Sequence, residues 1–83
     1  MLDESLKNAK NRVVGLKQTQ RALTGGTVER LYLAQDAEQK IRHPLEETCR
    51  QMQIEIIAVP TMAELGKACG IQVGTAVAAT LKA

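Results

Sequence analysis

Residues 54–64 read Ile-Glu-Ile-Ile-Ala-Val-Pro-Thr-Met-Ala-Glu, the clearest step from a strand to a helix in the sequence. The run over 54–59 is rich in β-branched residues, which favour strands. Pro60 would end that strand, and Thr61 and Glu64 have the spacing of a capping box, in which Thr61 caps the helix backbone and Glu64 reaches back to it. A buried strand that leads directly into a capped helix is typical of α/β proteins.

The rest of the chain continues this alternation in both directions. Before residue 54, the patterns first predict a short amphipathic helix with Leu2, Leu6, Ala9 and Val13, and then a brief strand over 12–15. A helix from Leu16, stopped by Gly25 and Gly26, should lead to a buried strand over 28–34 and a polar connection over 35–40. The next helix should have Pro44 in its first turn, with Ile41, Leu45, Cys49 and Met52 along one stripe. After it, a helix should end near Gly70, and a strand of small residues should span 75–81. This order predicts an α/β fold in which helices cover both faces of a small sheet.

Length and charge set further bounds. The 83 residues are expected to form one domain, over 1–83, around one core. A net charge of +2 permits a polyanionic partner without requiring one. The placement of charge is more informative, because the first quarter of the chain has only Asp3 and Glu4 as acids against the cations Lys7, Lys10, Arg12, Lys17 and Arg21. A basic N-terminal face is therefore predicted.

Catalytic and metal-binding candidates are weak. The one histidine, His43, precedes Pro44 at what we interpret as a helix start, with no catalytic partner beside it. Cys49 and Cys69 lie in apolar stretches, which favours buried free thiols over a disulfide, a zinc site or a nucleophile and indicates a reducing compartment. Neither a signal-peptide pattern nor an apolar run of about 18 residues is found. We expect a soluble cytoplasmic protein without enzyme activity, metal or cofactor.

The first candidate binding site is the turn at Gly15 and the helix start that follows it. Free N–H groups and the positive end of the helix dipole suit an anion such as phosphate. Lys17 in the first turn opposes that dipole, so a ligand explains it better than local stability does. With Gln18 and Arg21 it would offer donors to phosphate or guanine acceptors. On these residues alone, a solvated helix face is the commoner alternative.

The second candidate site is the predicted loop over 70–74, in which glycines bracket two β-branched residues. Ile71 and Val73 either fold inward as core, which is the more frequent case, or present an apolar platform to a partner. Gly66 lies inside the preceding helix, where glycine costs about 1 kcal/mol relative to alanine. Its presence indicates close packing or the close approach of a ligand.

Three stretches together resemble a known protein family. They are Gly-Leu-Lys-Gln-Thr-Gln-Arg-Ala-Leu over 15–23, Leu-Tyr-Leu-Ala-Gln-Asp-Ala over 31–37 and Glu-Leu-Gly-Lys-Ala-Cys-Gly-Ile over 64–71. In this order, and over nearly the whole chain, they resemble the L7Ae/L30e family of ribosomal proteins. The similarity is greatest to its short bacterial members, described as ribosomal-protein-like binders of kink-turn RNA.

The resemblance implies a three-layer α/β/α sandwich around a small mixed sheet, and a monomer that binds kink-turn RNA, ribosomal or regulatory, with the ribosome as a candidate partner. In the family, one glycine-containing helix start enters the RNA at sheared G·A pairs, and the loop after the last long helix packs against an extruded nucleotide. The positions matching these two regions, together with Lys67, are the predicted RNA-binding residues: Gly15, Lys17, Gln18, Arg21, Lys67, Gly70, Ile71, Gln72 and Val73.

Two features leave alternatives open. The sequence has Lys17 and Gln18 where the archaeal pattern has Asn and Glu, and Arg21 where it has Lys, which is similar to the bacterial variant. Which bases Lys17 and Gln18 would read is therefore open, because these side chains cannot reproduce the archaeal contacts atom for atom. The rival hypothesis is a protein-interaction module of the same fold in a ribosome-associated assembly.

Overall fold

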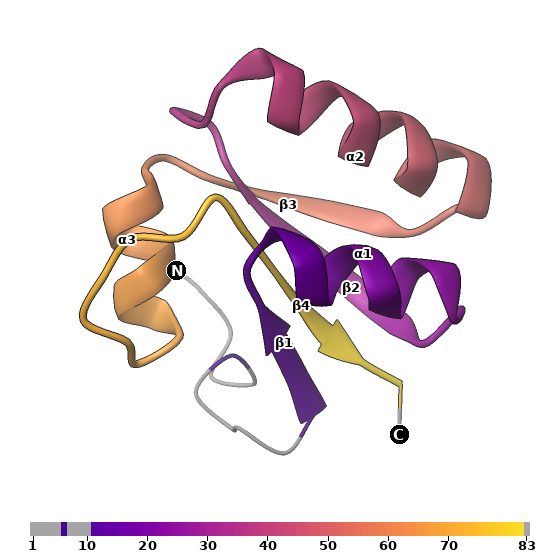
Figure 1. Cartoon of the computed structure of the whole chain (residues 1–83), viewed down its shortest axis with the longest axis horizontal. Helices are drawn as coiled ribbons and strands as arrows, with labels where there is room; N and C mark the ends of the chain where they lie inside the picture. The colour runs from indigo at the N-terminus through magenta and orange to yellow at the C-terminus, as the bar shows by residue number, and fades with distance from the viewer. Residues whose placement is uncertain (1–5, 7–10, 83) are drawn as a thin grey trace.

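A computed structural model describes residues 6 and 11–82 of the chain (Figure 1). Within them, four strands form one mixed sheet in the order β1-β4-β2-β3. The strands are β1 (Arg12–Val14), β2 (Val28–Ala34), β3 (Glu55–Val59) and β4 (Val77–Leu81), and the helices are α1 (Leu16–Thr24), α2 (Gln39–Met52) and α3 (Met62–Ala68). β2 pairs in parallel with β3, whereas β4 is antiparallel to both β1 and β2.

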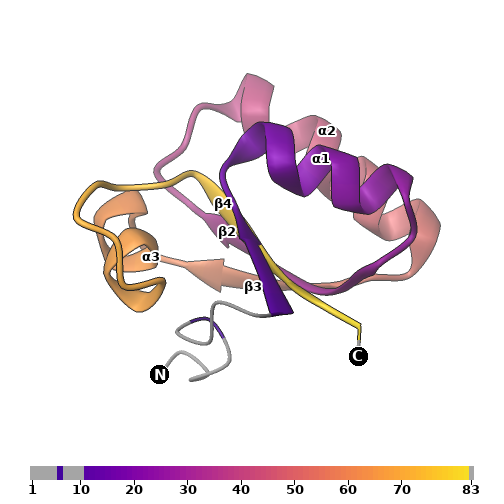
Figure 2. The same cartoon turned by 60° about the horizontal axis from the view of Figure 1, so that its bottom comes forward.

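The helices cover both faces of the sheet. α1 and α2 lie together on one face and α3 lies on the other (Figures 1 and 2). Because side chains alternate along a strand, β2 sends Leu31 and Leu33 into a core beneath α1 and α2, and Tyr32 and Ala34 into a second core beneath α3. The predicted three-layer α/β/α sandwich with a small mixed sheet is thus confirmed.

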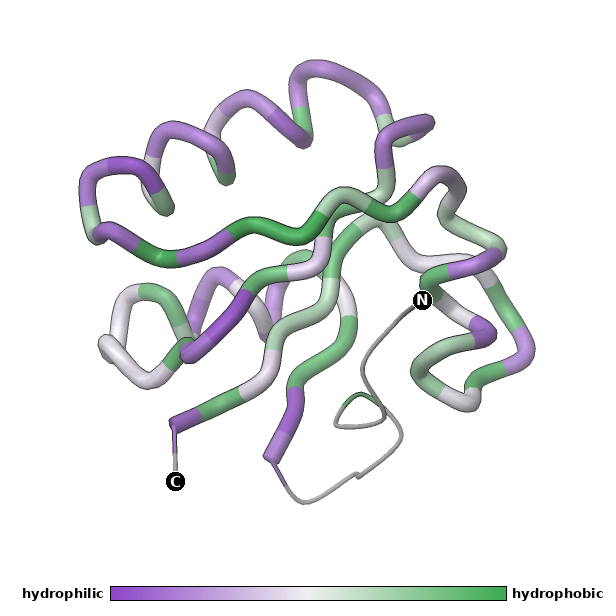
Figure 3. Tube along the Cα trace, turned by 180° about the vertical axis from the view of Figure 1, so that it is seen from behind, coloured by the Kyte–Doolittle hydropathy of each residue, from purple (hydrophilic) through white to green (hydrophobic). Residues whose placement is uncertain are grey.

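The residues of each element match their layer. α2 is largely hydrophilic in Figure 3, with hydrophobic residues on the turns that approach the sheet, and Leu45 and Cys49 are its buried residues. The predicted stop of α1 is also confirmed, since Gly26 adopts a left-handed φ of 71° and Thr27 N–H donates to the Ala22 carbonyl at 3.1 Å. The predicted Thr61 cap forms as well, because its hydroxyl accepts from the Glu64 N–H at 3.1 Å.

The start of α2 was predicted wrongly. The helix begins at Gln39, so Pro44 and His43 lie inside it and the polar connection is shorter than expected. Proline has no backbone N–H, so Pro44 cannot donate the helical hydrogen bond to the carbonyl of Lys40, which is an exposed residue. The partly buried Ile41 packs against the core beneath α1 and α2, which favours helix formation ahead of the proline.

Smaller boundary predictions also need correction. Met52 is 42% exposed, so the apolar stripe of α2 ends at Cys49. β3 begins at Glu55, one residue later than predicted, and β4 begins at Val77. Thr75 is not part of β4, because it donates its N–H to the Met62 carbonyl at 3.1 Å and so belongs to the loop that packs on α3. The predicted N-terminal helix lies outside the described residues, except for Leu6, which is fully buried beneath α3.

Candidate functional site

The sheet topology brings the two predicted binding segments to one end of the molecule. β4 runs antiparallel to β1 and β2, so the loop before β4 lies beside the residues that follow β1 and β2. Gly15 N–H donates to the Val77 carbonyl at 2.9 Å, and Ala34 N–H donates to the Ala76 carbonyl at 2.9 Å. The start of α1 and the end of the loop that leads into β4 therefore lie side by side (Figure 1).

The first turn of α1 is open to an anion. Gly15 has a φ of 96°, a conformation that favours glycine, and it offers no side-chain acceptor to the N–H groups of the first turn. No acidic residue lies in that turn. Because the N-terminal end of a helix carries partial positive charge, this turn favours a negatively charged ligand.

Lys17, Gln18 and Arg21 are all exposed, as predicted. Among the ion pairs formed by the described residues, none includes Lys17 or Arg21. These two cations line a shallow depression together with Gln20 and Thr24. Gln20 and Thr24 were not among the predicted binding residues, although the spacing i, i+3, i+4 and i+7 from Lys17 places all four on one helix face.

A groove between α1 and α2 adjoins this depression. Gln20 and Thr24 belong to both, and the groove is further lined by Leu23, Pro44, Leu45, Thr48 and Met52. It is more apolar than the face of α1 that carries Lys17 and Arg21. The exposed surface of α1 thus has a cationic face beside an apolar groove.

The loop over 70–74 is held tightly against α3. A Cβ on Gly66 would overlap the Val73 carbonyl, and a Cβ on Gly74 would lie 3.2 Å from the Met62 backbone. Ile71 N–H donates to the Gly66 carbonyl at 3.1 Å. Of the two explanations for Gly66, the structure supports close packing, and the packed segment is the backbone of the loop itself.

The structure separates the two apolar residues of this loop. Val73 is 70% exposed, whereas Ile71 is partly buried and packs against the core beneath α3. Gly70, with a left-handed φ of 77°, and Gln72 are exposed beside them. Lys67 is exposed in the last turn of α3. Val73 alone therefore presents a large apolar side chain to solvent from this loop.

Arg12 ties the base of the loop to the sheet. Its guanidinium donates to the Cys69 carbonyl, at the C-terminal end of α3, and to the Leu6 carbonyl at 2.9 Å. A cation at this position also stabilises the helix dipole. Burial raises the pKa of the Cys69 thiol, which disfavours the thiolate that a nucleophile requires.

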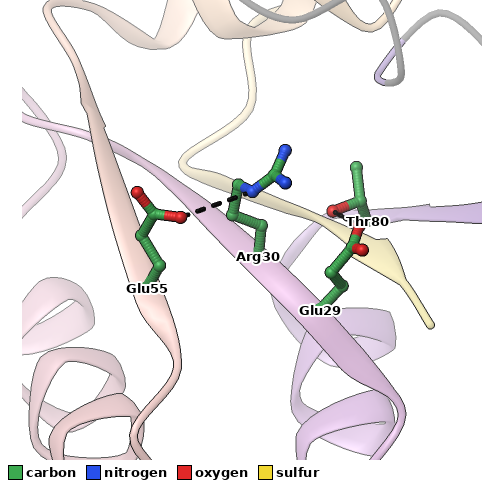
Figure 4. Close-up of polar contacts among 4 residues, drawn as sticks. All are labelled: Glu29, Arg30, Glu55 and Thr80. Atoms are coloured by element: carbon green, nitrogen blue, oxygen red, sulfur yellow. Dashed lines mark hydrogen bonds and ion pairs between the residues drawn. The ribbon is translucent and has the colours of Figure 1, made fainter.

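A polar row crosses the sheet at the end remote from this surface. The cross-strand register aligns Arg12, Thr80, Arg30 and Glu55 on the face that carries α3. Arg30 and Glu55 form an ion pair at 3.4 Å, and the Thr80 hydroxyl donates to Glu29 at 3.4 Å (Figure 4). The neighbouring Tyr32 phenol raises the pKa of Arg30 further above its ordinary value. Apart from Arg12, these side chains are thus engaged in contacts between neighbouring strands.

Residues 6 and 11–82 contain neither a cluster that could hold a metal ion nor a helix that could cross a membrane. No group of three or more His, Cys, Asp or Glu side chains comes together there in a way that could hold a metal ion. None of the helices in this part of the chain is both long enough and apolar enough to cross a membrane.

Comparison with known proteins identifies the family. The model of the ribosomal protein L7Ae/L30e/S12e/Gadd45 family matches residues 2–83, and the chain belongs to this family. An RNA-binding protein of Caldanaerobacter subterraneus subsp. tengcongensis is 46% identical over 68 residues, which are 82% of this chain and 83% of that protein. An RNA-binding protein of Halalkalibacterium halodurans is 42% identical over 95% of this chain and 96% of its own length.

Solved structures agree with the fold. A protein of unknown function from Bacillus halodurans superposes with a TM-score of 0.84 at 25% identity, covering 96% of this chain and 83% of that one. A 15.5 kD RNA-binding protein of Giardia lamblia superposes with a TM-score of 0.85 at 22% identity, covering 96% and 68%. At this identity, the Giardia protein supports the fold alone.

Proposed function

We propose that this protein binds RNA and stabilises its kinked form at a kink-turn. The observation that carries the proposal is that the start of α1, the helix with the exposed cations Lys17 and Arg21, and the loop with the exposed Val73 lie at the same end of the sheet. Membership of the family and the two bacterial relatives named as RNA-binding proteins support it.

The geometry suits a bent duplex better than a regular one. The major groove of A-form RNA is too deep and narrow for side chains unless a bulge or kink opens it. The first turn of α1 can enter such an opening, where its N–H groups and Lys17 would contact phosphates and Gln18 would reach base edges. Arg21, one turn further along α1, would hold the adjoining phosphates.

The loop over 70–74 would serve the other part of the kink. Val73 is positioned to cover an extruded nucleotide, with Gly70 and Gln72 beside it and Ile71 supporting the loop from the core side. Lys67, in the last turn of α3, would add a further phosphate contact. Val73 would therefore contact the nucleotide, whereas Ile71 would fix the position of the loop.

The RNA would be a ribosomal or regulatory RNA of the cytoplasm. The two buried cysteines support this location, since free thiols persist in a reducing compartment. The protein would either stay bound to ribosomal RNA in the ribosome or bind a regulatory RNA transiently. RNA crosslinked to the protein in its native cells, when sequenced, would distinguish the two.

The rival function is docking of a protein partner in a ribosome-associated assembly. The groove between α1 and α2 favours it, because Leu23, Pro44 and Met52 give this groove an apolar lining. Such a partner would bind without any dependence on RNA structure. RNA binding is favoured because the cations of α1 are free of ion pairs with the described carboxylates.

A binding comparison tests the proposal directly. The protein should bind a hairpin containing a kink-turn much more tightly than a plain hairpin of equal length, at the same salt concentration. Equal affinity for both would show only the sequence-independent attraction of a basic face for phosphate. No binding to either RNA would leave the protein-docking function as the better account.

A further inference from the structure

Residues 61–75, which comprise α3 and the loop before β4, form a compact body of their own. Among the residues that the structure describes, the backbone hydrogen bonds of this segment all run within it, and the one from Thr75 N–H to the Met62 carbonyl brings its two ends together at 3.1 Å. The Val73 carbonyl also packs directly on Gly66. Figures 1 and 2 show the segment beside one end of the sheet, and we call it the α3 flap.

Side chains attach the α3 flap to the rest of the molecule. Near its first residue, Met62 N–H donates to the Asp36 carboxylate at 2.8 Å. At the C-terminal end of α3, the Arg12 guanidinium donates to the Cys69 carbonyl and also to the Leu6 carbonyl, the latter at 2.9 Å. Leu6 itself is fully buried and packs with Cys69 in the core beneath α3. Leu6 and Arg12 together form a latch that holds the flap on the sheet.

We infer that the α3 flap opens from the sheet as a unit, and that the latch of Leu6 and Arg12 controls this opening. A segment whose backbone hydrogen bonds are internal can leave the sheet without breaking them. Its opening exposes the core beneath α3, whereas the core beneath α1 and α2 lies on the other face of the sheet and stays closed. Opening of the flap therefore costs less free energy than unfolding of the whole chain.

The latch bears on RNA binding, and this step rests on the proposed function. The flap carries Lys67 and the loop over 70–74, whereas Lys17 and Arg21 belong to α1 and lie outside it. An RNA that contacts both parts would bind the protein only while the flap is closed. The latch would then set the fraction of the protein that is competent to bind, and bound RNA would in turn hold the flap closed.

Two buried free cysteines can report on the two cores separately. Cys69 lies with Leu6 in the core beneath α3, and Cys49 lies with Leu45 in the core beneath α1 and α2. An uncharged maleimide reacts with either thiol only when an opening exposes it, and mass spectrometry of the peptides tells the two thiols apart. The labelling rate of each cysteine in the native full-length chain therefore measures the opening of its own core.

Cys69 should be labelled faster than Cys49, and its rate should depend less on urea. The physical reason is that opening of the flap exposes less surface than global unfolding, and the urea dependence scales with the surface exposed. Equal rates with equal urea dependence would show that the flap opens only when the whole protein unfolds. That outcome would refute the inference.

Matched substitutions in the two cores test the role of Leu6. Leu6→Val should speed the labelling of Cys69 by about two- to tenfold, the effect of removing one buried methylene group. Leu45→Val removes the same group from the other core. It should leave the labelling of Cys69 unchanged, because the core beneath α1 and α2 remains intact when the flap opens. If Leu45→Val speeds the labelling of Cys69 as much as Leu6→Val does, the opening is global and the inference fails.

Arg12→Gln tests the hydrogen bonds of the latch. Loss of the guanidinium should speed the labelling of Cys69 by about ten- to hundredfold, the range for losing a hydrogen bond to a charged group. Arg12→Lys keeps the positive charge near the end of α3 but lacks the planar fork that reaches both carbonyls, so it should restore only part of the protection. An unchanged labelling rate of Cys69 in Arg12→Gln would refute the latch.

A kink-turn RNA tests the link to RNA binding, once titration has established that it binds. At about a hundred times its dissociation constant, it should slow the labelling of Cys69 about a hundredfold, because only the closed protein binds. If the RNA binds but the labelling of Cys69 does not slow, the link between flap and RNA is refuted and the RNA-binding function stands. If the protein does not prefer the kink-turn RNA, the proposed function fails, and the labelling rates measured without RNA still decide whether the latch exists.

Discussion

The Val73 carbonyl lies so close to Gly66 that even the smallest side chain at Gly66 would overlap it. Gly66 therefore allows the Val73 carbonyl to pack directly on α3, which fixes the position of the loop over 70–74 on this helix. This packing holds Val73 at the surface, in the loop that leads into β4. Stability of the fold and placement of the candidate RNA contact therefore depend on the same residue.

Gly66→Ala should lower the free energy of unfolding by about 1–3 kcal/mol, the usual cost of overpacking a tight contact. Alanine has the higher helix propensity, so a loss of stability would be due to the collision with Val73 and not to the helix. Urea denaturation measures the change. Gly25→Ala is the control, because its Cβ would lie 3.5 Å from the Arg21 carbonyl, an ordinary contact. Equal effects of the two substitutions would contradict the packing argument.

Lys17→Ala and Arg21→Ala should each weaken kink-turn binding by about 1–3 kcal/mol, the range of a good base or charge-assisted contact. Folding should be nearly unchanged, because both side chains are exposed and Lys17 opposes the helix dipole. Titration of a labelled RNA measures the affinity. Lys40→Ala, which removes a 78% exposed cation from α2, should have little effect. Unchanged titrations for both α1 variants would place the RNA site elsewhere.

Val73→Asp should reduce RNA binding more than it reduces stability. Val73 is 70% exposed, so the new carboxylate stays hydrated while it repels the RNA phosphates. Thermal melting followed by circular dichroism, together with RNA titration, measures the two effects. Ile71→Asp should instead destabilise the fold, because Ile71 packs against the core beneath α3. A Val73→Asp protein that unfolds would show that Val73 belongs to the core.

Gln53→Gly should raise the free energy of unfolding by about 0.5–1 kcal/mol. Gln53 caps α2 with a left-handed φ of 59°, which glycine adopts without the clash of a Cβ. Part of that gain is offset by the greater freedom of glycine in the unfolded chain. Gln51→Gly, within α2, should have the opposite sign and lower stability by about 1 kcal/mol. Urea denaturation of both variants distinguishes the two signs.

Local rules predicted the parts of this fold that depend on neighbours in sequence. The Thr61 cap and the glycine stop of α1 form as expected, because both are hydrogen-bonding patterns within a few residues. The start of α2 was wrong, since Ile41 gains packing on a sheet that is distant in sequence and this outweighs the preference of Pro44 for a first turn.

The candidate site shows the same division. The exposure of Lys17 and Arg21 could be predicted, because both lie on the polar face of one amphipathic helix and the periodicity of the sequence defines that face. Ile71 and Val73 look equivalent in sequence, because a loop has no regular period that assigns each residue to the core or the surface. The segment that packs against Gly66 could not be predicted either, because helix spacing alone does not reveal that the loop over 70–74 crosses α3.

Addition of the protein should drive a flexible bulged RNA into its kinked form. The start of α1 and the loop with the exposed Val73 lie at the same end of the sheet, so a bent RNA can contact both. Moving an RNA from 1% to 99% kinked needs about 5.5 kcal/mol of differential affinity, which several contacts of about 1–3 kcal/mol can supply together. Fluorescence transfer between labelled RNA ends, at low divalent-ion concentration, should therefore rise with protein. Added monovalent salt should weaken the rise, because Lys17, Arg21 and Lys67 would displace counterions. Replacing the sheared G·A pairs with Watson–Crick pairs should abolish it, and binding without any rise would mean that the basic face holds RNA without recognising the kink.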